Sequence, residues 1–546
     1  MVLRRIPATV EAVADSTTAS TPPPRVICLL CDGTGDMFDG DNSNVVKLFQ
    51  ALRKDDPRQL CYYQCGVGTY TSSAKSSLKT GFSAALDMAI GSSLGTHVKE
   101  AYQFLMQTYR EGDKISVLGF SRGAYTARAL CGMLTKVGLL PRHNIAQLPF
   151  AYDWYCDDSA YGWQMSADFK RTFSIDVNVH FLGCWDTVAS VGVIPRILPL
   201  AKSDNSSVAF FRHALALDER RAKFKANHWY QRHPAKAKKG STHVDSSGRE
   251  SSYGVYGTFD LEGLYDNAEQ GAPPAKTTKA QQSQQMSPST TDPSSLATSN
   301  SSTTLRDANT AEDLGDSKRK VKKSQRQLNL IKEFKEKDAR EWGRPPFQTD
   351  VEEVWFAGSH ADVGGGAVPN SERHQASRIP LRWMIRETFK CNTGLLYRTD
   401  VLAEHGLDVE TLYPKVLPRS EPAVGPSPNY LERHARGDLP TLDSRRSMVR
   451  GAHEDYFDSI ASLNDQLKQA KVWWILELAW PIKYRIQDKE TGIWRKKIGL
   501  NRGRYRTVRE TEPKMHFSVR QRERWAKEGY RVKATADDEA IWQIVH

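Results

Sequence analysis

KISVLGFSRGAYTARAL, residues 114–130, is the stretch that decides the fold. Its first seven residues form an apolar run of the kind found in strands buried on both faces of a sheet. The remaining residues continue as a helix, so the segment predicts a strand that turns directly into a helix. At the turn stands GFSRG, residues 119–123. A GxSxG motif after a strand and before a helix has the context that a nucleophile elbow requires.

Similar apolar runs recur along the chain and alternate with helical patterns. The runs are VICLLC (26–31), LCYYQC (60–65), VNVHFLGCWD (177–186) and EVWFAG (353–358). Helical spacing of apolar residues is clearest over 81–109 and 121–138. Buried strands that alternate with amphipathic helices predict an α/β fold with a mainly parallel sheet covered on both faces. Reactive residues then gather in loops at the carboxyl ends of the strands.

Composition divides the 546 residues into five parts. Residues 1–24 predict a disordered leader, with no apolar core of signal-peptide length. The catalytic domain covers 25–235 and resumes over 346–395. Between them, 236–345 is a low-complexity insertion rich in Ser, Thr, Gln and Pro, which we expect to be largely disordered. Residues 396–546 form a C-terminal, α-rich extension that could act as a lid or an interfacial region.

The net charge of +12 would suit an anionic partner. Much of the excess lies in two stretches, SKRKVKKSQR (317–326) and WRKKIGLNRGRYRTVR (494–509), so a nucleic-acid partner is not favoured. The charged segment 318–342 predicts a solvated helix. The most apolar late segment, VWWILELAWPI (472–482), is too short to span a bilayer. These features predict a cytoplasmic protein with no transmembrane helix, either free or peripheral at membranes.

The eight cysteines predict reduced core residues and no metal site. CLLC at 28–31 has a zinc-like spacing, but no second pair lies nearby, and the run is typical of a buried strand. No motif predicts a cofactor.

Steric constraints explain why glycines stand two residues before and two residues after Ser121 in the expected elbow. Side chains at positions 119 and 123 would collide with the strand and the helix, so Gly119 and Gly123 leave the Ser121 hydroxyl accessible. The helix begins at the nucleophile, which brings the Arg122 amide and the positive end of the helix dipole to a developing oxyanion. The alternative, a serine that only caps the helix, stays open.

The loop CDGTGD (31–36) after the first strand predicts the second half of the oxyanion hole, around Asp32 and Gly33. A competing interpretation is the DxDGT nucleophile of phosphatases that form an aspartyl phosphate. That motif needs an aspartate where this chain has Leu30, so it is disfavoured.

A nucleophilic serine needs a base, and the base needs an acid that fixes its tautomer. The chain order expected with this elbow is Ser, Asp or Glu, then His. Asp186 ends the run VHFLGCWD, and His360 follows the run EVWFAGS. Both positions deliver side chains to the same rim as Ser121. We therefore expect His360 to be the base and Asp186 the acid.

The surrounding segment GSHADVGGG (358–366) leaves alternatives. Asp362 could be the orienting acid or a structural loop carboxylate. His516, in MHFSVRQR, is a second candidate base, but its context does not indicate the end of a strand. A His-x-Asp pair offers at most two metal ligands from one loop. We expect Gly364 to Gly366 to allow close backbone approach and a tight exit.

Taken together, the motifs resemble a known family. The resemblance rests on DGTGD followed by SNV, QCGVGT, GFSRGAYTARAL, CWDTVASVG, RHALALDERR and FAGSHADVGGG with IPLRWMI. These are similar, in order, to the α/β-hydrolase family that was formerly a domain of unknown function and is now named after phospholipase effectors of type VI secretion. The resemblance covers roughly 25–235 and 350–395. It implies serine-dependent hydrolysis of phospholipid carboxyl esters, with nucleophile, acid and base at Ser121, Asp186 and His360.

Two departures accompany the resemblance: CDGTGD stands where the family more often has FDGTGN, and the insertion is not part of the common core. The leading hypothesis is a serine hydrolase of α/β-hydrolase fold that cleaves esters, most simply of lipids. The alternative is a non-catalytic scaffold of the same fold that binds an anionic partner through the basic insertion. A carbohydrate or peptide esterase is a third option. The aromatic segment around Trp473 predicts either a membrane-interfacial surface or a helix packed over the site.

Overall fold

A computed structural model gives the architecture and a parallel sheet at its centre. The structure describes residues 7–16, 24–34, 36–66, 83–188, 198–201, 205, 207–229, 329–343, 349–419, 426–438, 451–479, 481–487, 494–510, 512–527, 529–536 and 540–546. Most of the predicted insertion lies outside these residues.

Eight strands form the central sheet in the order β14-β12-β7-β6-β5-β4-β2-β3, and every neighbouring pair is parallel. The strands are β2 (Val26–Cys31), β3 (Gln59–Gln64), β4 (Lys114–Phe120), β5 (Val179–Trp185), β6 (Val208–Ala216), β7 (Asp350–Phe356), β12 (Lys514–His516) and β14 (Gln543–Val545). The predicted α/β fold is confirmed. The last two strands come from the C-terminal extension, so that segment extends the same sheet.

Strand β2 shows why the sheet is covered on both faces. All six of its residues are buried. Ile27 and Leu29 point into one hydrophobic core, whereas Cys28 and Leu30 point into the other. The CLLC run is therefore a strand with alternate side chains in two layers, and all eight cysteines are free thiols.

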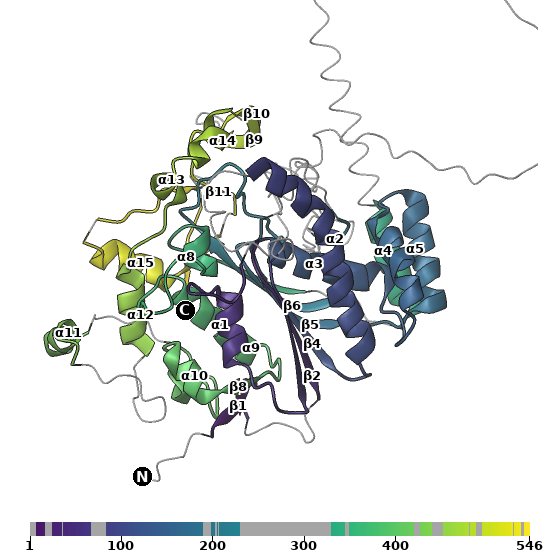
Figure 1. Ribbon diagram of the computed structural model, residues 1–546, viewed down its shortest axis with the longest axis horizontal. Helices are drawn as coiled ribbons and strands as arrows, with labels where there is room; N and C mark the ends of the chain where they lie inside the picture. The colour runs from purple at the N-terminus through teal and green to yellow at the C-terminus, as the bar shows by residue number, and fades with distance from the viewer. Residues whose placement is uncertain are drawn as a thin grey trace, which may run out of the picture.

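Helices cover each face of the sheet (Figure 1). On one side lie α2 (Ser83–Thr108), α3 (Ser121–Val137), α4 (Leu148–Cys156) and α5 (Ala160–Phe173). On the other lie α1 (Asn44–Ala51), α9 (Arg378–Lys390) and α10 (Thr399–Glu404). None of the helices in the described part of the chain combines the length and apolarity needed to cross a bilayer.

The chain reverses its direction across the sheet between β2 and β4. From β2 it runs to β3 at one edge, then returns to β4 and continues outward through β5, β6 and β7. Such a switch point leaves the carboxyl ends of the neighbouring strands open to a ligand. The elbow serine follows β4 and therefore lies at this position.

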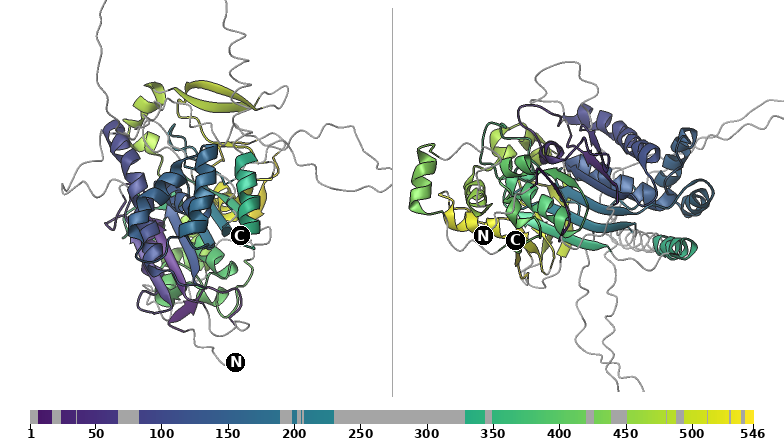
Figure 2. Two further views of the ribbon diagram at one scale, coloured as in Figure 1. Left: turned by 90° about the vertical axis from the view of Figure 1, so that its right-hand side faces the viewer. Right: turned by 90° about the horizontal axis from the view of Figure 1, so that it is seen from below.

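The C-terminal extension was expected to be α-rich, but it mixes helices and strands. Its further elements are α11 (Pro428–Ala435), α12 (Gly451–Ile460), α13 (Gln466–Gln469), α14 (Trp473–Ala479), β11 (Thr507–Val508), α15 (Phe517–Trp525) and β13 (Thr535–Ala536). Strands β9 (Pro481–Gln487) and β10 (Trp494–Leu500) pair as an antiparallel hairpin. Figure 2 shows this hairpin beside α14, projecting beyond the central sheet.

Part of the predicted disordered leader is ordered. Strand β1 (Thr9–Glu11) pairs antiparallel with β8 (Leu396–Arg398). The reason is burial, because Val10 and Ala12 are enclosed in the core beside α1 and α9.

The charged segment near the end of the insertion is helical over 329–341, as expected, but it is not solvated all round. Its residues Ile331 and Phe334 are buried against Trp163. Lys170 of α5 donates to Asp338 at 2.7 Å. Arg171 of α5 also pairs with Glu341 at 3.4 Å, so the helix packs on α5 through one apolar face and two ion pairs.

Candidate active site

Ser121 lies at the sharp turn between β4 and α3. It is the first residue of α3 and has φ +58°, a left-handed backbone conformation that is rare for serine. Its side chain is largely enclosed, with 5% of the residue exposed. The backbone at GFSRG thus makes the sharp strand-to-helix turn that a nucleophile elbow requires.

Two glycines make this turn sterically possible. A Cβ on Gly119 would lie 2.6 Å from the carbonyl oxygen of Gly123. A Cβ on Gly123 would lie 2.3 Å from the carbonyl oxygens of Cys31 and Asp32. These separations are far below van der Waals contact, so only glycine fits at either position.

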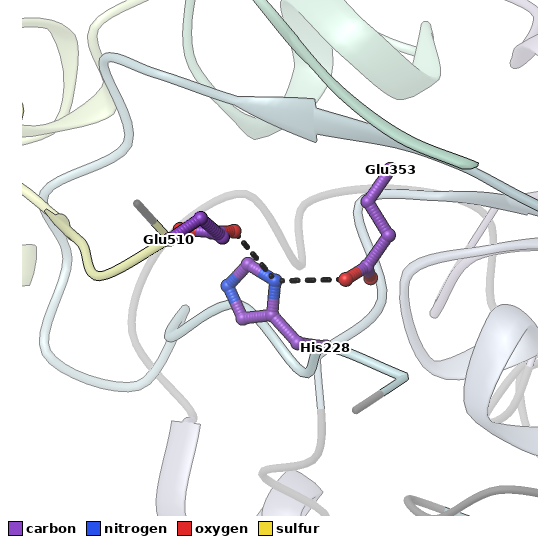
Figure 3. A group of neighbouring side chains, drawn as sticks. All are labelled: His228, Glu353 and Glu510. Atoms are coloured by element: carbon purple, nitrogen blue, oxygen red, sulfur yellow. Dashed lines mark hydrogen bonds and ion pairs between the residues drawn. The ribbon is translucent and has the colours of Figure 1, made fainter. Parts of the chain in front are cut away.

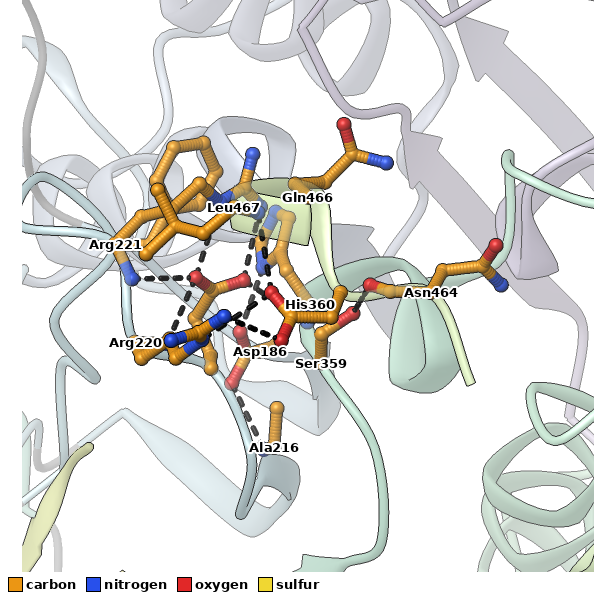
Figure 4. Close-up of polar contacts among 12 residues, drawn as sticks. Asp186, Ala216, Arg220, Arg221, Ser359, His360, Asn464, Gln466 and Leu467 are labelled. Atoms are coloured by element: carbon orange, nitrogen blue, oxygen red, sulfur yellow. Dashed lines mark hydrogen bonds and ion pairs between the residues drawn. The ribbon is translucent and has the colours of Figure 1, made fainter. Parts of the chain in front are cut away.

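Ser121, His360 and Asp186 form one hydrogen-bonded chain. His360 Nε2 lies 2.8 Å from the Ser121 hydroxyl oxygen. His360 Nδ1 lies 2.6 Å from Asp186 Oδ2. Figure 4 shows the imidazole facing the Asp186 carboxylate. The structure therefore brings together three residues that are separated by more than two hundred positions along the chain.

Each partner comes from the carboxyl end of a parallel strand. Asp186 follows β5 directly, and its backbone has φ +40°. His360 begins α8 (His360–Gly364), a short helix four residues beyond the end of β7. The parallel arrangement delivers all three side chains to the same edge of the sheet.

Aromatic rings enclose the imidazole. The rings of Phe120 and Phe224 lie 4.7 and 4.9 Å from the His360 ring, measured between centroids. Arg221 lies over the ring of Phe224, with 3.5 Å between the guanidinium carbon and the ring centroid. His360 is therefore held between two rings and has little freedom to rotate.

Burial and charge together set the protonation of the pair. Burial would raise the pKa of Asp186, but the charge of Arg506 and the hydrogen bond from His360 outweigh it and lower that pKa well below the ordinary range. Burial lowers the pKa of His360, and the opposing effect of Asp186 only partly offsets it. His360 is thus neutral and Asp186 ionised near pH 7, the states that a general base and its orienting acid need.

The last three glycines of GSHADVGGG, Gly364 to Gly366, have the close approach and tight exit expected of them. A Cβ on Gly364 would lie 1.8 Å from the Phe120 ring, so the backbone approaches the elbow closely. Gly365 and Gly366 both have φ +83°, which forms the tight exit from α8. This loop is a support for the base.

Asp362 is a loop carboxylate and makes no hydrogen bond to the His360 ring in the described contacts. Its Oδ2 accepts from the Ser359 amide at 2.8 Å, which caps α8. Asn464, from the C-terminal extension, donates to Asp362 Oδ1 at 2.9 Å. The carboxylate therefore fixes the loop that carries His360.

His516 does end a strand, contrary to the expectation from its sequence context. It is the last residue of β12 and caps α15, with Nδ1 2.8 Å from the Ser518 hydroxyl. Its ring stacks on Phe356 with 4.8 Å between centroids, and the residue is fully buried. It has no contact with Ser121 or Asp186 among the described contacts.

The oxyanion donors predicted from the sequence are amides of α3 and of the loop after β2. Arg122 lies in the first turn of α3, where backbone N–H groups have no partner within the helix. The Gly33 amide donates to Asp32 Oδ1 at 2.8 Å. Asp32 is buried and also accepts from Ser43 and Tyr63, at 2.6 and 2.8 Å. The amide of Gly33 is thus engaged in this state and would have to leave Asp32 to meet an oxyanion.

Among the residues that sequence reasoning missed, Arg506 contacts the acid directly. Arg506 donates to Asp186 through Nη1 to Oδ1 at 2.6 Å and through Nη2 to Oδ2 at 2.9 Å. It lies in the basic stretch 494–509, which stood out in the sequence only as a source of positive charge. No motif sets it apart there; the signal is the fold, which turns this one arginine inward.

Two groups of side chains outside the site have the composition of metal ligands. In the first, His228 Nδ1 lies 3.2 Å from Glu353 and 3.4 Å from Glu510 (Figure 3). Burial would lower the pKa of His228, but these two carboxylates outweigh it and raise that pKa. In the second, Glu454 and Asp458 beside His374 pair with Arg378. Both groups are explained as ion pairs, and no chemistry is assigned to a metal.

The sequence of this chain is similar to that of a protein family and to that of an uncharacterized yeast protein. A family model described as "T6SS, Phospholipase effector Tle1-like, catalytic domain" matches residues 25–387. An uncharacterized protein of Saccharomyces cerevisiae is 29% identical over 545 residues, which covers 90% of this chain and 78% of the yeast protein.

Two solved structures are also similar. A crystal structure of an uncharacterized protein from Pseudomonas aeruginosa is matched over 80% of this chain and 53% of that chain, with 16% identity and a TM-score of 0.29. The structure of the Tle1 effector bound to the VgrG spike of the Type 6 secretion system is matched over 40% of this chain and 53% of that chain, with 17% identity and a TM-score of 0.23. The chain thus spans about half the length of each.

Proposed function

The chain belongs to the family of Tle1-like phospholipase effector catalytic domains, and from this premise we propose that it is a serine hydrolase of carboxyl esters in lipids. The observation that carries the proposal is the hydrogen-bonded chain from Ser121 through His360 to Asp186 at a strained elbow. The family name supports a phospholipase, and the geometry supports a serine nucleophile with a histidine base.

In the proposed catalytic relay, Ser121, His360 and Asp186 each have one role. Ser121 Oγ attacks the ester carbonyl carbon while His360 Nε2 takes the hydroxyl proton. The resulting imidazolium is stabilised by Asp186, which accepts from Nδ1–H and keeps the tautomer correct. His360 then gives the proton to the leaving alcohol. In the second half of the reaction, His360 takes a proton from water, which attacks the acyl-enzyme. The carboxylic acid is released, and the Ser121 hydroxyl is restored.

The oxyanion needs donors beside Ser121. The Arg122 amide at the start of α3 fits this role, since the helix dipole places partial positive charge there. Gly33 supplies a second amide once it leaves Asp32. Burial and the nearby Asp32 raise the pKa of Asp36, so this neighbouring carboxyl is less readily ionised than an exposed aspartate.

An apolar face of α14 supports contact with a lipid surface. Ile475 and Leu478 are exposed three residues apart on one side of α14, and Val472, just before the helix begins, is also exposed. The opposite side of α14 carries Trp473. Its ring centroid lies 5.7 Å from that of Phe224, the residue whose ring packs against His360. We propose that this face rests on a phospholipid membrane while the site takes its substrate.

The first test is ester hydrolysis by the wild type, Ser121→Ala and His360→Ala, with p-nitrophenyl esters and phospholipid vesicles as substrates. We expect each variant to lose about three or more orders of magnitude in kcat, because the relay acts as a unit. A fluorophosphonate probe should label the wild type and not Ser121→Ala.

His516→Asn is the matched control, because it removes a buried histidine but keeps an N-cap acceptor for α15. It should stay within about tenfold of the wild type, a change of about 1.4 kcal/mol in barrier. If folded wild type neither turns over esters nor labels, the hydrolase proposal is wrong. The non-catalytic scaffold is then the better explanation.

A further inference from the structure

We infer that Arg506 is a positioning residue of the relay, which fixes the Asp186 carboxylate in the orientation that His360 requires. The inference rests on the proposed function. Arg506 lies more than a hundred residues beyond the part of the chain that the family model matches, 25–387. The C-terminal extension would therefore complete the catalytic site.

The guanidinium of Arg506 is fully engaged. A guanidinium carries about five N–H donors. Two of these bonds go to the two oxygens of Asp186, at 2.6 and 2.9 Å. The others go to the Ala216 carbonyl at 2.9 Å and to the Phe224 carbonyl at 3.1 and 2.5 Å. Every donor has an acceptor, so the plane of the guanidinium is fixed.

The fork of two hydrogen bonds from the Arg506 guanidinium determines the orientation of the Asp186 carboxylate. Asp186 Oδ1 also accepts from the Ala216 amide at 3.0 Å, and Oδ2 accepts from His360. Bidentate pairing holds a carboxylate in the plane of the guanidinium. Without Arg506, the carboxylate would retain one backbone donor on Oδ1 and could rotate about its Cβ–Cγ bond. The hydrogen bond to His360 would then lose its direction.

Arg506 also fixes one wall of the site. Its Nε and Nη2 hold the carbonyl of Phe224, and the Phe224 ring packs against His360. One side chain thus constrains both the acid that contacts the imidazole and a ring that limits its rotation. A residue that only stabilised the fold would not act on the protonation of His360, and this difference can be measured.

Charge makes that measurement possible. The charged groups that face Asp186 and His360 are Arg506, Arg221 and Glu219. Arg221 pairs with Glu219 at 2.9 Å, so their charges largely compensate each other. Loss of the Arg506 charge should stabilise the His360 imidazolium and raise its pKa. The acid limb of kcat/KM, which falls as His360 becomes protonated, should then move to higher pH.

The experiment compares full-length wild type, Arg506→Met and Arg506→Lys by the pH dependence of kcat/KM on a soluble ester. We expect Arg506→Met to lose about 100-fold in kcat, as misplacement of a catalytic group does. Its acid limb should move up by about one pH unit, the size expected for losing a charge beside a carboxylate. Arg506→Lys keeps the charge without the fork, so its kcat should fall while its acid limb stays in place.

Arg522→Met is the matched control, because Arg522 is another buried arginine of the extension that donates to backbone carbonyls, those of Ser459 and Ala461. It should lower thermal stability without moving the acid limb. Should Arg506→Met fail to melt cooperatively, Arg506→Lys alone decides. Unchanged kcat in folded Arg506→Lys would overturn the inference, as would an acid limb of folded Arg506→Met that matches the wild type.

The inference can be separated from the proposed function. The titration of His360 can be followed by NMR with 15N-labelled histidine, which needs no turnover, and the His360→Ala spectrum assigns the resonance. If the wild type has no esterase activity but Arg506→Met still raises the His360 pKa, the hydrolase proposal fails and the positioning of Asp186 stands. If the His360 titration is the same in both proteins, the inference about Arg506 fails.

Discussion

At the residue scale, the site concentrates backbone strain where the chemistry is expected. Ser121 and Asp186 both adopt positive φ, at +58° and +40°, without being glycine. Such conformations cost of the order of 1–3 kcal/mol each and persist only where the surroundings enforce them. At Asp186 the enforcement comes from a backbone bond to Ala214 at 2.8 Å and from Arg506. At Ser121 it comes from the close contact of α3 with β2 at Gly123.

Gly123→Ala tests this contact. A methyl group there meets two backbone carbonyl oxygens at 2.3 Å, and backbone cannot move aside as a flexible side chain can. We expect a loss of about 1–3 kcal/mol or more in unfolding free energy, measured by urea denaturation, and a larger loss of ester hydrolysis than of stability.

Gly40→Ala is the control for that substitution, because a Cβ at Gly40 meets nothing within 4 Å. Its stability and activity should match the wild type. Equal effects of the two substitutions would contradict the steric account of the elbow.

Local sequence patterns predicted the three residues of the relay but not the contacts that surround them. Ser121, Asp186 and His360 each end an apolar run that can be recognised locally, and the parallel topology brings such ends together. The contact of Arg506 with Asp186 spans 320 residues and no local pattern precedes it. The engagement of the Gly33 amide by Asp32 depends on a side-chain rotamer, which sequence periodicity does not determine.

At the scale of elements, buried ion pairs join the C-terminal helix α12 to α9. Arg382 of α9 is almost fully buried and pairs with Asp455 and Asp458 of α12, each at 2.7 Å. Burial alone would raise the pKa of Asp455, but Arg419 and Arg382 lower it below its ordinary value. The stability from these pairs is therefore present above the ordinary aspartate pKa of about 3.9 and is lost as the pH falls below it.

Arg382→Met should destabilise the protein by about 3 kcal/mol, because each of two buried carboxylates would lose one arginine partner. Asp455 would keep Arg419, and Asp458 would keep Arg378. The measurement is the midpoint of thermal or urea unfolding at pH 7. Part of the loss in unfolding free energy should disappear at acidic pH, where protonation of Asp455 and Asp458 removes their negative charge.

Arg520→Met, which breaks the exposed pair between Arg520 and Glu523 at 2.7 Å, is the control. It should cost no more than about 0.5 kcal/mol, as exposed pairs do. If the buried and exposed substitutions cost the same, the ion pairs do not hold α12 to α9.

The elements that the sequence did not predict have specific causes. Strand β6 was missed because Arg212 and His213 interrupt its apolar run. In the structure Arg212 pairs with Glu387 at 2.7 Å and His213 with Glu353 at 2.8 Å, so both are buried with partners. Strands β12 and β14 are three residues long, too short for an alternating pattern to stand out. They become strands because an existing sheet edge accepts them.

At the scale of the whole molecule, the C-terminal extension closes around the site and ends in an exposed surface. Asn464 bonds the loop of His360, and Glu477 of α14 accepts from the Ala222 amide at 2.5 Å. The inward side of α14 is thereby anchored near the relay, while its apolar side faces outward. The packing interpretation of the aromatic segment fits the inward side of α14, and the interfacial interpretation stays a prediction for the outward side.

Vesicle binding tests the outward side. The double variant Ile475→Asp/Leu478→Asp places charge where two side chains are 63% and 53% exposed, so the fold should tolerate it. Each buried aliphatic side chain contributes about 1.5–3 kcal/mol to partition into an apolar phase. We therefore expect at least tenfold weaker sedimentation with phosphatidylserine-containing vesicles and a matching loss of vesicle hydrolysis. Hydrolysis of a soluble ester should stay at the wild-type rate.

The charges beside this face determine which membrane it suits. Three exposed basic residues lie on segments that adjoin α14: Lys471 directly precedes the helix, Lys497 is on β10, which contacts it, and Arg502 donates its amide to the Glu477 carbonyl. Each basic residue near an anionic leaflet contributes about 1 kcal/mol. Wild type should thus bind phosphatidylserine vesicles more tightly than phosphatidylcholine vesicles, and added salt should reduce the difference. Ile541→Asp, at a residue 69% exposed elsewhere in the extension, is the control and should bind normally. Equal vesicle binding by the wild type and the double variant would show that α14 does not meet the membrane, whatever the relay hydrolyses.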